Sequence, residues 1–558
     1  MSRFATGLLR TEVAVLVPES TIKTCIPAAR ACTAAAFNAE IPKAGNIAGP
    51  MLASLDVLLR NHIDFELIFE EVLENAEVEN GVIKAPNSRF SVLIIPQGLV
   101  LSKALTARLT MFIQAGGNVI FIGCRVDRTY GEALSEQERQ ILSGQPLLPF
   151  EAGETPEFRA ELWNAVASRI ELPYRLIGEG VDNVFTALRD CDGIPTLLLS
   201  NQGAMPVEFM LETTLPAPVQ AISVDDGSRW AMNVSNIQLY PEQSVLLEFG
   251  RDMPFNNIPA AYQGFPRQDL LQLDDQWNYE LTCPNIAVCR FEIGLVSGET
   301  KDFPEQVKCW IPVSRDGCHG LNFSPEEYPW SYLRGEFLIN DASVLSDLAL
   351  IVDSTDYDLV ILNGQEISSS VPYTLWDHDN RKFEIEQAAR LGINHLVVRI
   401  RTSMWASPER AVHVHDFIEP VVLHGRFAAN LSGDNTVLSA LPGKIKTGDL
   451  RQQGFPQYIG EVIYRHNFVW NDKLPEKARI FLPKVAVGSV EAELNGISPD
   501  IRLWQPYLFD CADILCAGNN ELAIRVSSRL GMLLPRIYGG IKIPEMPFGI
   551  LTNPTIVP

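Results

Sequence analysis

Cysteine is scarce in this sequence of 558 residues: there are ten cysteines, and none of them forms a CxxC pair. So few cysteines exclude a disulfide scaffold, and without CxxC pairs a zinc cluster has no support. Cys283 with Cys289, and Cys511 with Cys516, are close enough in sequence to pair, but ordinary buried thiols fit them better. We therefore expect no metal and no other cofactor.

Long apolar runs and basic clusters are also missing. No stretch of eighteen apolar residues occurs, so no segment is predicted to span a membrane. Glu12 and Glu19 interrupt the first residues, which lack the layout of a secretory signal, and cytoplasmic is the default expectation. A formal charge of −23 argues against nucleic acid and anionic membranes, because phosphates attract Lys and Arg. A neutral or weakly charged ligand fits better.

The N-terminal part of the chain alternates buried strands with helices. With 46% hydrophobic residues, a chain of this length predicts several folded domains. The strands are expected at 12–18, 64–71, 90–96 and 116–123, and the helices at 28–37, 51–60 and 103–115. This pattern predicts a doubly wound parallel sheet. Since neither GxGxxG nor GxxxxGK[ST] occurs, a nucleotide site is excluded.

From about Thr155 the pattern changes to short alternating segments. Asp226-Gly227 between two of them is typical of a hairpin turn. We expect a small antiparallel β-sandwich that ends near Gly250, followed by a proline-rich linker.

The rest of the chain repeats one pattern, and we expect each copy to form a jelly-roll sandwich. An Asn-Gly pair ends an alternating strand at Asn363 and again at Asn495, where a two-residue turn requires positive φ. Each copy closes on Gly-x-Asn-x-Leu, at 392–396 and 518–522. In the closing strand of the first copy, alternation predicts an inward row of Leu396, Val398 and Ile400 and an outward Arg399. In the second copy, it predicts an inward row of Leu522, Ile524 and Val526 and an outward Arg525.

Cys124 follows a predicted parallel strand, where a nucleophile elbow would lie. Gly123 is present, but Arg125 and Val126 stand where the sharp turn needs a second glycine. No His-x-Glu pair follows to act as base and orienter. An ordinary thiol is the better interpretation.

A few polar and aromatic clusters are candidates for binding or catalysis. His413, His415 and Asp416, with His424 nearby, resemble metal ligands, but no third ligand follows at fixed spacing. The acidic clusters DDQW, DHD and SPEEYPW cannot be paired by spacing, because the two carboxylates of a glycosidase meet only in space. Catalytic residues therefore stay unassigned. The candidates for stacking on a sugar face are Trp376, Trp504 and Tyr507, with packing in the sandwich core as the alternative.

Taken in order, several blocks resemble the C-terminal half of glycoside hydrolase family 106, the α-L-rhamnosidase family. EVAVLVP, IDFELIFEEVLENAEVENGVI and AGGNVIFIG resemble its glutamine-amidotransferase-like domain, which is non-catalytic in β-galactosidases. HGRFAAN and TGDLRQQGFPQYIGEVIYRHNF resemble the link into its last sandwich. The final domain there has a galactose-binding-type fold, which is similar to LNG, WQPYLFD, GNNELAIRV and RLGMLLP.

The resemblance implies a multidomain chain that combines α/β with all-β structure. An amidotransferase-like doubly wound α/β domain at 1–150 would precede a small antiparallel sandwich at 151–255. Two galactose-binding-like jelly rolls would follow at 256–410 and 411–558. The family's acid, base and calcium ligands lie on a (β/α)₈ barrel upstream of these domains, so no catalytic residue is carried over to this chain.

The sequence thus predicts an ancillary, carbohydrate-associated part of a glycoside hydrolase that lacks the catalytic barrel. The expected partners are a glycan or oligosaccharide, and either a barrel encoded upstream or further copies of this chain. Two alternatives stay open: a free-standing carbohydrate-binding protein, and an active glycoside hydrolase with an unrecognised site.

Overall fold

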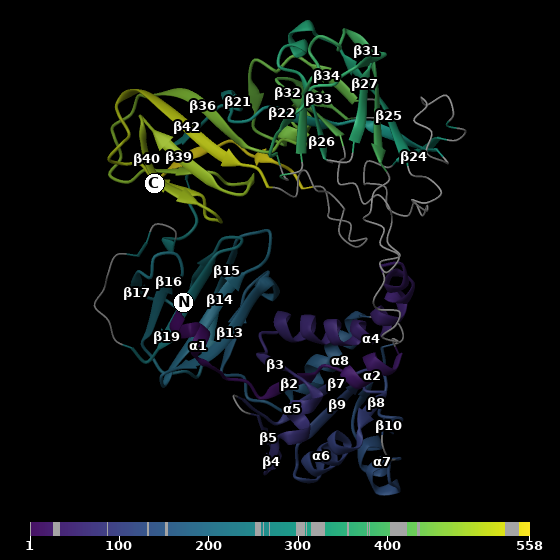
Figure 1. Cartoon of the computed structure of the whole chain (residues 1–558). Helices are drawn as coiled ribbons and strands as arrows, with labels where there is room; N and C mark the ends of the chain where they lie inside the picture. Colours follow the sequence, from purple (N-terminus) through teal and green to yellow (C-terminus); the bar gives the residue numbers. More distant parts are fainter. Residues whose placement is uncertain are drawn as a thin grey trace. The chain divides into compact units, whose positions relative to one another are not determined.

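The computed structural model describes residues 2–25, 34–85, 88–130, 133–150, 154–251, 258–259, 262–266, 268–296, 307, 310–313, 330–353, 357–375, 378, 380–401, 421–431, 436–529 and 546–558. The chain divides into two compact units, Met1–Phe265 with Trp504–Pro506, and Pro266–Leu503 with Tyr507–Pro558. Strands in many sheets dominate over a few helices, so the chain is multidomain and combines α/β with all-β structure (Figure 1). Across these residues, no helix has the length and apolar character needed to cross a membrane.

A five-stranded parallel sheet organises the first unit, with the order β11-β9-β7-β2-β3. Its strands are β2 (Val13–Leu16), β3 (Phe65–Ile68), β7 (Val92–Pro96), β9 (Asn118–Ile122) and β11 (Leu147–Leu148). Every neighbouring pair is parallel, as expected for the four strands predicted from the sequence. β11 has only two residues, too few for a recognisable sequence pattern.

Alternate residues of these strands face two layers of helices. Val13 and Val15 pack in one core with α4 (Ala34–Arg60) and α8 (Pro156–Ala167). Ala14 and Leu16 pack in the other core, which includes residues of α5 (Glu70–Asn75), α6 (Lys103–Gln114) and α7 (Glu136–Ser143). Because the sheet is buried on both faces, its strands are continuously apolar.

The antiparallel part of the first unit is a two-layer sandwich with one core. One sheet has the order β1 (Leu8–Leu9), β13 (Val184–Cys191), β14 (Ile194–Asn201), β19 (Ser244–Phe249), β16 (Val219–Ser223) and β17 (Arg229–Ala231). The other sheet has the order β12 (Tyr174–Ile177), β15 (Val207–Thr213) and β18 (Ile237–Leu239). The hairpin expected at Asp226-Gly227 joins β16 to β17, with Gly227 at φ 73°.

The second unit contains two further β-sandwiches, each with its own core. In the first, one sheet is β22 (Asn285–Val288), β32 (Val421–Gly425), β26 (Ala349–Asp353), β30 (Asn380–Glu384) and β29 (Val371–Pro372). The main path of its second sheet is β24 (Trp310–Val313), β23 (Arg290–Val296), β25 (Trp330–Ile339), β31 (Gly392–Arg401), β27 (Tyr357–Leu362) and β28 (Gln365–Glu366). β33 (Ala428–Asn430) and β34 (Thr436–Ser439) extend that sheet beside β25.

The last sandwich has the same two-layer construction. Its smaller sheet is β20 (Leu271–Gln272), β44 (Thr555–Val557), β37 (Arg479–Phe481) and β41 (Leu508–Asp510). Its larger sheet is β35 (Ile445–Lys446), β21 (Gln276–Leu281), β36 (Glu461–Trp470), β42 (Gly518–Ser527), β39 (Val490–Leu494) and β40 (Ile497–Arg502).

The two sandwiches of the second unit carry the repeat predicted from the sequence. Asn363 and Asn495 begin their turns at φ 53° and 52°, as Asn-Gly hairpins require. The side chains predicted to face inward in the two closing strands are fully buried. Ile400 is left out of this comparison, because the structure does not describe its side chain. Arg525 faces outward as expected, but Arg399 is only 7% exposed. Its guanidinium lies 5.3 Å from the centroid of the Trp330 ring, which the alternation pattern could not reveal.

Candidate functional site

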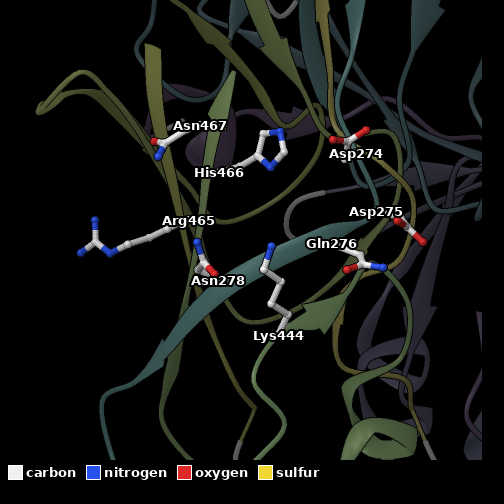
Figure 2. Close-up of a pocket in the computed structure, with 8 residues that line it drawn as sticks. All are labelled: Asp274, Asp275, Gln276, Asn278, Lys444, Arg465, His466 and Asn467. Atoms are coloured by element: carbon white, nitrogen blue, oxygen red, sulfur yellow. The ribbon is translucent and has the colours of Figure 1, made fainter. Parts of the chain in front are cut away.

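A pocket of about 450 Å³ opens in the last sandwich, beside the point where β21 and β36 separate. These strands pair only from Asn278 opposite Arg465 to Leu281 opposite Val462. Gln276 and Trp277, at the start of β21, pair instead with β35 on its other edge. The residues that line the pocket are Asp274, Asp275, Gln276, Asn278, Lys444, Arg465, His466 and Asn467 (Figure 2).

Trp277 holds this part of the sheet in place. The side chain is fully buried, and its indole N–H donates to the backbone oxygen of Asp274 at 3.0 Å. Its ring centroid lies 4.9 Å from that of His466 and 6.0 Å from that of Tyr464. Since His466 pairs with the inward-facing Leu522, the imidazole belongs to the inner face of the sheet and is half-buried. The tryptophan thereby links the beginning of β21 to the middle of β36.

The lining of the pocket includes charged groups of both signs. The carboxylates of Asp274 and Asp275 are matched in formal charge by Lys444 and Arg465. In Figure 2, the side chains of Lys444 and His466 point toward a common space, whereas Arg465 points away from it. The guanidinium of Arg465 lies 3.6 Å from Glu280 and 3.7 Å from Glu521, which accounts for its direction.

The remaining lining groups are side-chain amides. Gln276, Asn278 and Asn467 are exposed, and each amide offers both hydrogen-bond donors and acceptors. Such a set suits a neutral ligand with several hydroxyl groups, because each hydroxyl also donates and accepts. Asp274 and Asp275 are neighbours in the chain and both exposed, which is a poor arrangement for an acid and a base on opposite sides of a glycosidic bond.

The aromatic residues predicted from the sequence do not line this pocket where they are described. Trp376 lies outside the described residues. Trp504 follows β40 and is 40% exposed, so its ring is accessible. Tyr507 is 3% exposed and packs in the core of the last sandwich, which matches the alternative role considered for it. Sequence patterns missed the pocket itself, although its acidic end is the DDQW cluster.

Cys124 follows β9, as expected, and Gly123 before it has φ 77°. The thiol donates to the side-chain oxygen of Gln97 at 3.1 Å. Of the other cysteines considered, Cys283 and Cys516 are exposed, and neither they nor the buried Cys289 and Cys511 form a disulfide.

The histidine cluster considered as a metal site is only partly described. His413, His415 and Asp416 lie outside the described residues. His424, on β32, is buried, and burial lowers its pKa to about 4, so the imidazole is neutral. Its Nε2 lies 3.2 Å from the Tyr373 hydroxyl. Within the described ranges, no three His, Cys, Asp or Glu side chains come together as a metal site.

Comparisons with known proteins give structural likenesses only. No family model matches the chain, and no curated protein matches it in sequence. A rhamnosidase from Novosphingobium sp. PP1Y is 10% identical over 89% of this chain, with a TM-score of 0.36. An α-L-rhamnosidase from Streptomyces avermitilis, solved with L-rhamnose, is 14% identical over 65% of this chain, with a TM-score of 0.24. A β-galactosidase from Bacillus circulans sp. alkalophilus is 12% identical over 44% of it, with a TM-score of 0.31.

The chain spans 36% of the length of each rhamnosidase and 42% of the length of the β-galactosidase. At these identities and TM-scores, the likenesses carry no argument about activity.

Proposed function

We propose that this chain is an ancillary, carbohydrate-binding part of a glycoside hydrolase of the α-L-rhamnosidase type. The pocket beside β21 and β36 would contact the glycan. The observation that carries this proposal is the chemistry of that pocket, whose lining has two carboxylates, two cations and three exposed amides. The hydroxyl groups of a neutral sugar can replace their hydrogen bonds to water with hydrogen bonds to these side chains. A pocket that binds a neutral ligand needs no net charge.

The finer domain assignments belong to the same proposal. We infer an amidotransferase-like, non-catalytic domain at 1–150 and galactose-binding-like jelly rolls at 256–410 and 411–558, around the small sandwich at 151–255. The order of the parallel sheet supports the first assignment. The shared Asn-Gly turns and Gly-x-Asn-x-Leu closures support the others, together with the sequence blocks that resemble family 106.

A non-catalytic role is supported by the parallel strands of the described residues. They form one open sheet of five, the separate pair β8 (Val100–Ser102) with β10 (Arg128–Tyr130), and the pairing of β34 with β25 in the second unit. A TIM barrel closes eight parallel strands and carries its catalytic groups at their carboxyl ends. We propose that hydrolysis requires a barrel supplied by another polypeptide or segment. Trp504 and Trp376 remain proposed glycan contacts in their own right, independent of this pocket.

The binding proposal is tested by titration calorimetry with an aryl α-L-rhamnoside and an aryl β-D-galactoside as neutral probes. Gln276→Ala and Lys444→Ala should each weaken binding of the preferred probe about 3- to 10-fold, the equivalent of one hydrogen bond. Lys477→Ala, an exposed lysine of the same sandwich outside the pocket, should leave affinity unchanged.

Two results would count against this proposal. Binding that survives both pocket substitutions would remove the pocket from the function. Hydrolysis of either probe by the purified chain, lost when one of its own carboxylates is replaced, would show an enzyme instead. Salt provides a further check, because neutral ligands should bind about equally at low and high ionic strength.

A further inference from the structure

A larger pocket, of about 1250 Å³, lies within the first unit between the parallel sheet and the small sandwich. Two chain connections border it. Residues 10–12 lead from β1 of the sandwich into β2 of the parallel sheet, and residues 170–173 lead from α8 to β12. Asp64, which directly precedes β3, also lines it. Its side chain is half-buried in the wall of the pocket.

Within the part of the chain that the structure describes, one carboxylate oxygen of Asp64 accepts hydrogen bonds and the other does not. Oδ2 accepts a hydrogen bond from the backbone N–H of Leu188 at 3.0 Å and lies 3.3 Å from the hydroxyl of Tyr174. That hydroxyl also lies 2.8 Å from Oγ1 of Thr186. Among the described residues, Oδ1 has no hydrogen-bond partner. The second oxygen is therefore available to a ligand.

The surroundings of Asp64 decide its protonation. Burial raises its pKa to about 7, against the opposing effects of the Leu188 N–H, the Tyr174 hydroxyl and the charge of Arg189. Burial also raises the pKa of Tyr174 well above its usual value, so this hydroxyl keeps its proton. Burial lowers the pKa of His62, and Nε2 of its ring lies 2.9 Å from the backbone oxygen of Val181.

The rest of the wall combines apolar and charged side chains. Ile63, Leu172 and Leu188 supply apolar surface next to Asp64. The charged lining residues besides Asp64 are Arg10, Glu12, Lys84, Arg89, Glu171 and Asp190. Lys84 forms an ion pair with Glu79 outside the pocket. With Asp64 ionised, the lining carboxylates outnumber the cations, and one of those cations is already paired.

We propose that this pocket binds a small organic ammonium ion. Its charged group would meet Oδ1 of Asp64, and its apolar body would lie against Ile63, Leu172 and the ring of Tyr174. An ionised carboxylate in a poorly solvated position is unstable unless it is paired. A cation supplies that pairing and stabilises the ionised form, so the proton of Asp64 leaves to solvent as the ligand binds.

This inference goes beyond the proposed function and uses none of the residues of the sugar pocket. Binding of the cation and binding of a proton to Asp64 oppose each other. Below pH 7 the ligand must displace a proton, and above pH 7 it meets a carboxylate that is already ionised. Affinity should rise with pH across this range.

The experiment is titration calorimetry of the full chain with cyclohexylammonium chloride, repeated in two buffers of different ionisation enthalpy. Cyclohexanol, a neutral molecule of the same shape, is the matched probe. With a pKa of about 7, the ionised fraction of Asp64 is about ten-fold larger at pH 8 than at pH 6. Cyclohexylammonium should bind about ten-fold more tightly at pH 8, and release nearly one proton per ligand at pH 6. Cyclohexanol should bind at least about ten-fold more weakly at pH 8.

Asp64→Asn should abolish both the proton release and the pH dependence, because an amide does not titrate between pH 6 and pH 8. The amide oxygen can still accept the hydrogen bond from the Leu188 N–H, which preserves the local structure. Asp127→Asn, at an exposed aspartate outside the pocket, should change neither. The proposal is overturned if the unaltered chain binds both probes equally, binds cyclohexylammonium without proton release, or binds neither. These measurements need no variant, so a destabilised Asp64→Asn chain would not prevent the test. Failure here leaves the sugar-binding test unaffected.

Discussion

The side-chain amide of Asn495 donates a hydrogen bond to the side-chain oxygen of Asn520 at 2.9 Å. The corresponding residues of the preceding sandwich, Asn363 and Asn394, are joined in the same way at 2.8 Å. Each pair links an Asn-Gly turn to the Asn of the following Gly-x-Asn-x-Leu segment. The repeated sequence pattern therefore encodes a repeated hydrogen-bond network.

The network continues into the backbone on both sides. Asn520 accepts from the Cys516 N–H at 2.9 Å and donates to the oxygens of Cys516 at 2.7 Å and Gly518 at 3.0 Å. Asn495 donates to the Ile514 oxygen at 3.0 Å and accepts from the Glu521 N–H at 2.9 Å. In the other copy, Asn394 makes the matching bonds to Arg390 and Gly392. Two asparagines thus fasten the turn to the loop that precedes the last long strand.

Asn520→Ala should destabilise the last sandwich by about 2–4 kcal/mol, because it removes a buried side chain and all of its hydrogen bonds. Asn519→Ala is the matched control: this neighbour is exposed, and its loss should cost less than about 0.5 kcal/mol. Differential scanning calorimetry would measure both effects. Equal effects would mean that the network contributes nothing specific.

Asn495→Gly separates turn conformation from hydrogen bonding. Glycine adopts the φ of 52° without strain, so the substitution removes only the side-chain bonds. We expect a loss of about 2 kcal/mol. Asn80→Gly provides the comparison, because Asn80 has φ 49° and precedes Gly81, yet its side chain forms no hydrogen bond with the described residues. A loss at Asn495 no larger than at Asn80 would assign Asn495 to the turn alone.

Local sequence patterns were sufficient to predict the strands in which the order of apolar and polar residues alone determines which side chains are buried. The strands of the parallel sheet are apolar on both faces, and β42 alternates between Leu522, Ile524 and Val526 and the outward Arg525. In β31 the same alternation places Arg399 opposite Leu396 and Val398, but it did not reveal that Trp330 and Tyr332 from the neighbouring β25 cover its guanidinium. Coverage by a neighbouring strand has no signal in the strand's own sequence.

The two pockets depend on tertiary arrangement to an even greater degree. The first exists because β21 changes partners between Trp277 and Asn278, and this depends on pairing with β35 and β36 far along the chain. The second depends on Leu188 and Tyr174 of the small sandwich reaching Asp64. An aspartate before a strand is unremarkable in the sequence, and only its distant neighbours make it unusual.

The two described aromatic candidates should respond differently to truncation. Tyr507→Ala removes a ring from the core and should cost about 3–5 kcal/mol. Trp504→Ala, at a ring that is 40% exposed, should cost no more than about 1 kcal/mol, so its effect on glycan binding can be measured in a folded chain. Calorimetric unfolding of both variants checks this. A severe loss at Trp504 would show that its ring is structural.

The raised pKa of Asp64 also predicts how stability varies with pH. The pKa is about 7 in the folded chain, against 3.8 for an unperturbed aspartate. Between these two values the folded chain binds more protons than the unfolded chain, so this carboxyl makes the folded chain less stable as pH rises from about 4 to about 7.

Asp64→Asn removes that penalty and keeps an acceptor for the Leu188 N–H. The variant should match the unaltered chain near pH 4 and exceed its stability above pH 7 by at most about 4 kcal/mol. Urea unfolding of the first unit at pH 4.5, 6 and 8 measures the difference, with Asp127→Asn as a control that should stay near zero throughout. A difference that does not change with pH would show that Asp64 is ionised in the folded chain across this range, and that its burial does not govern its proton.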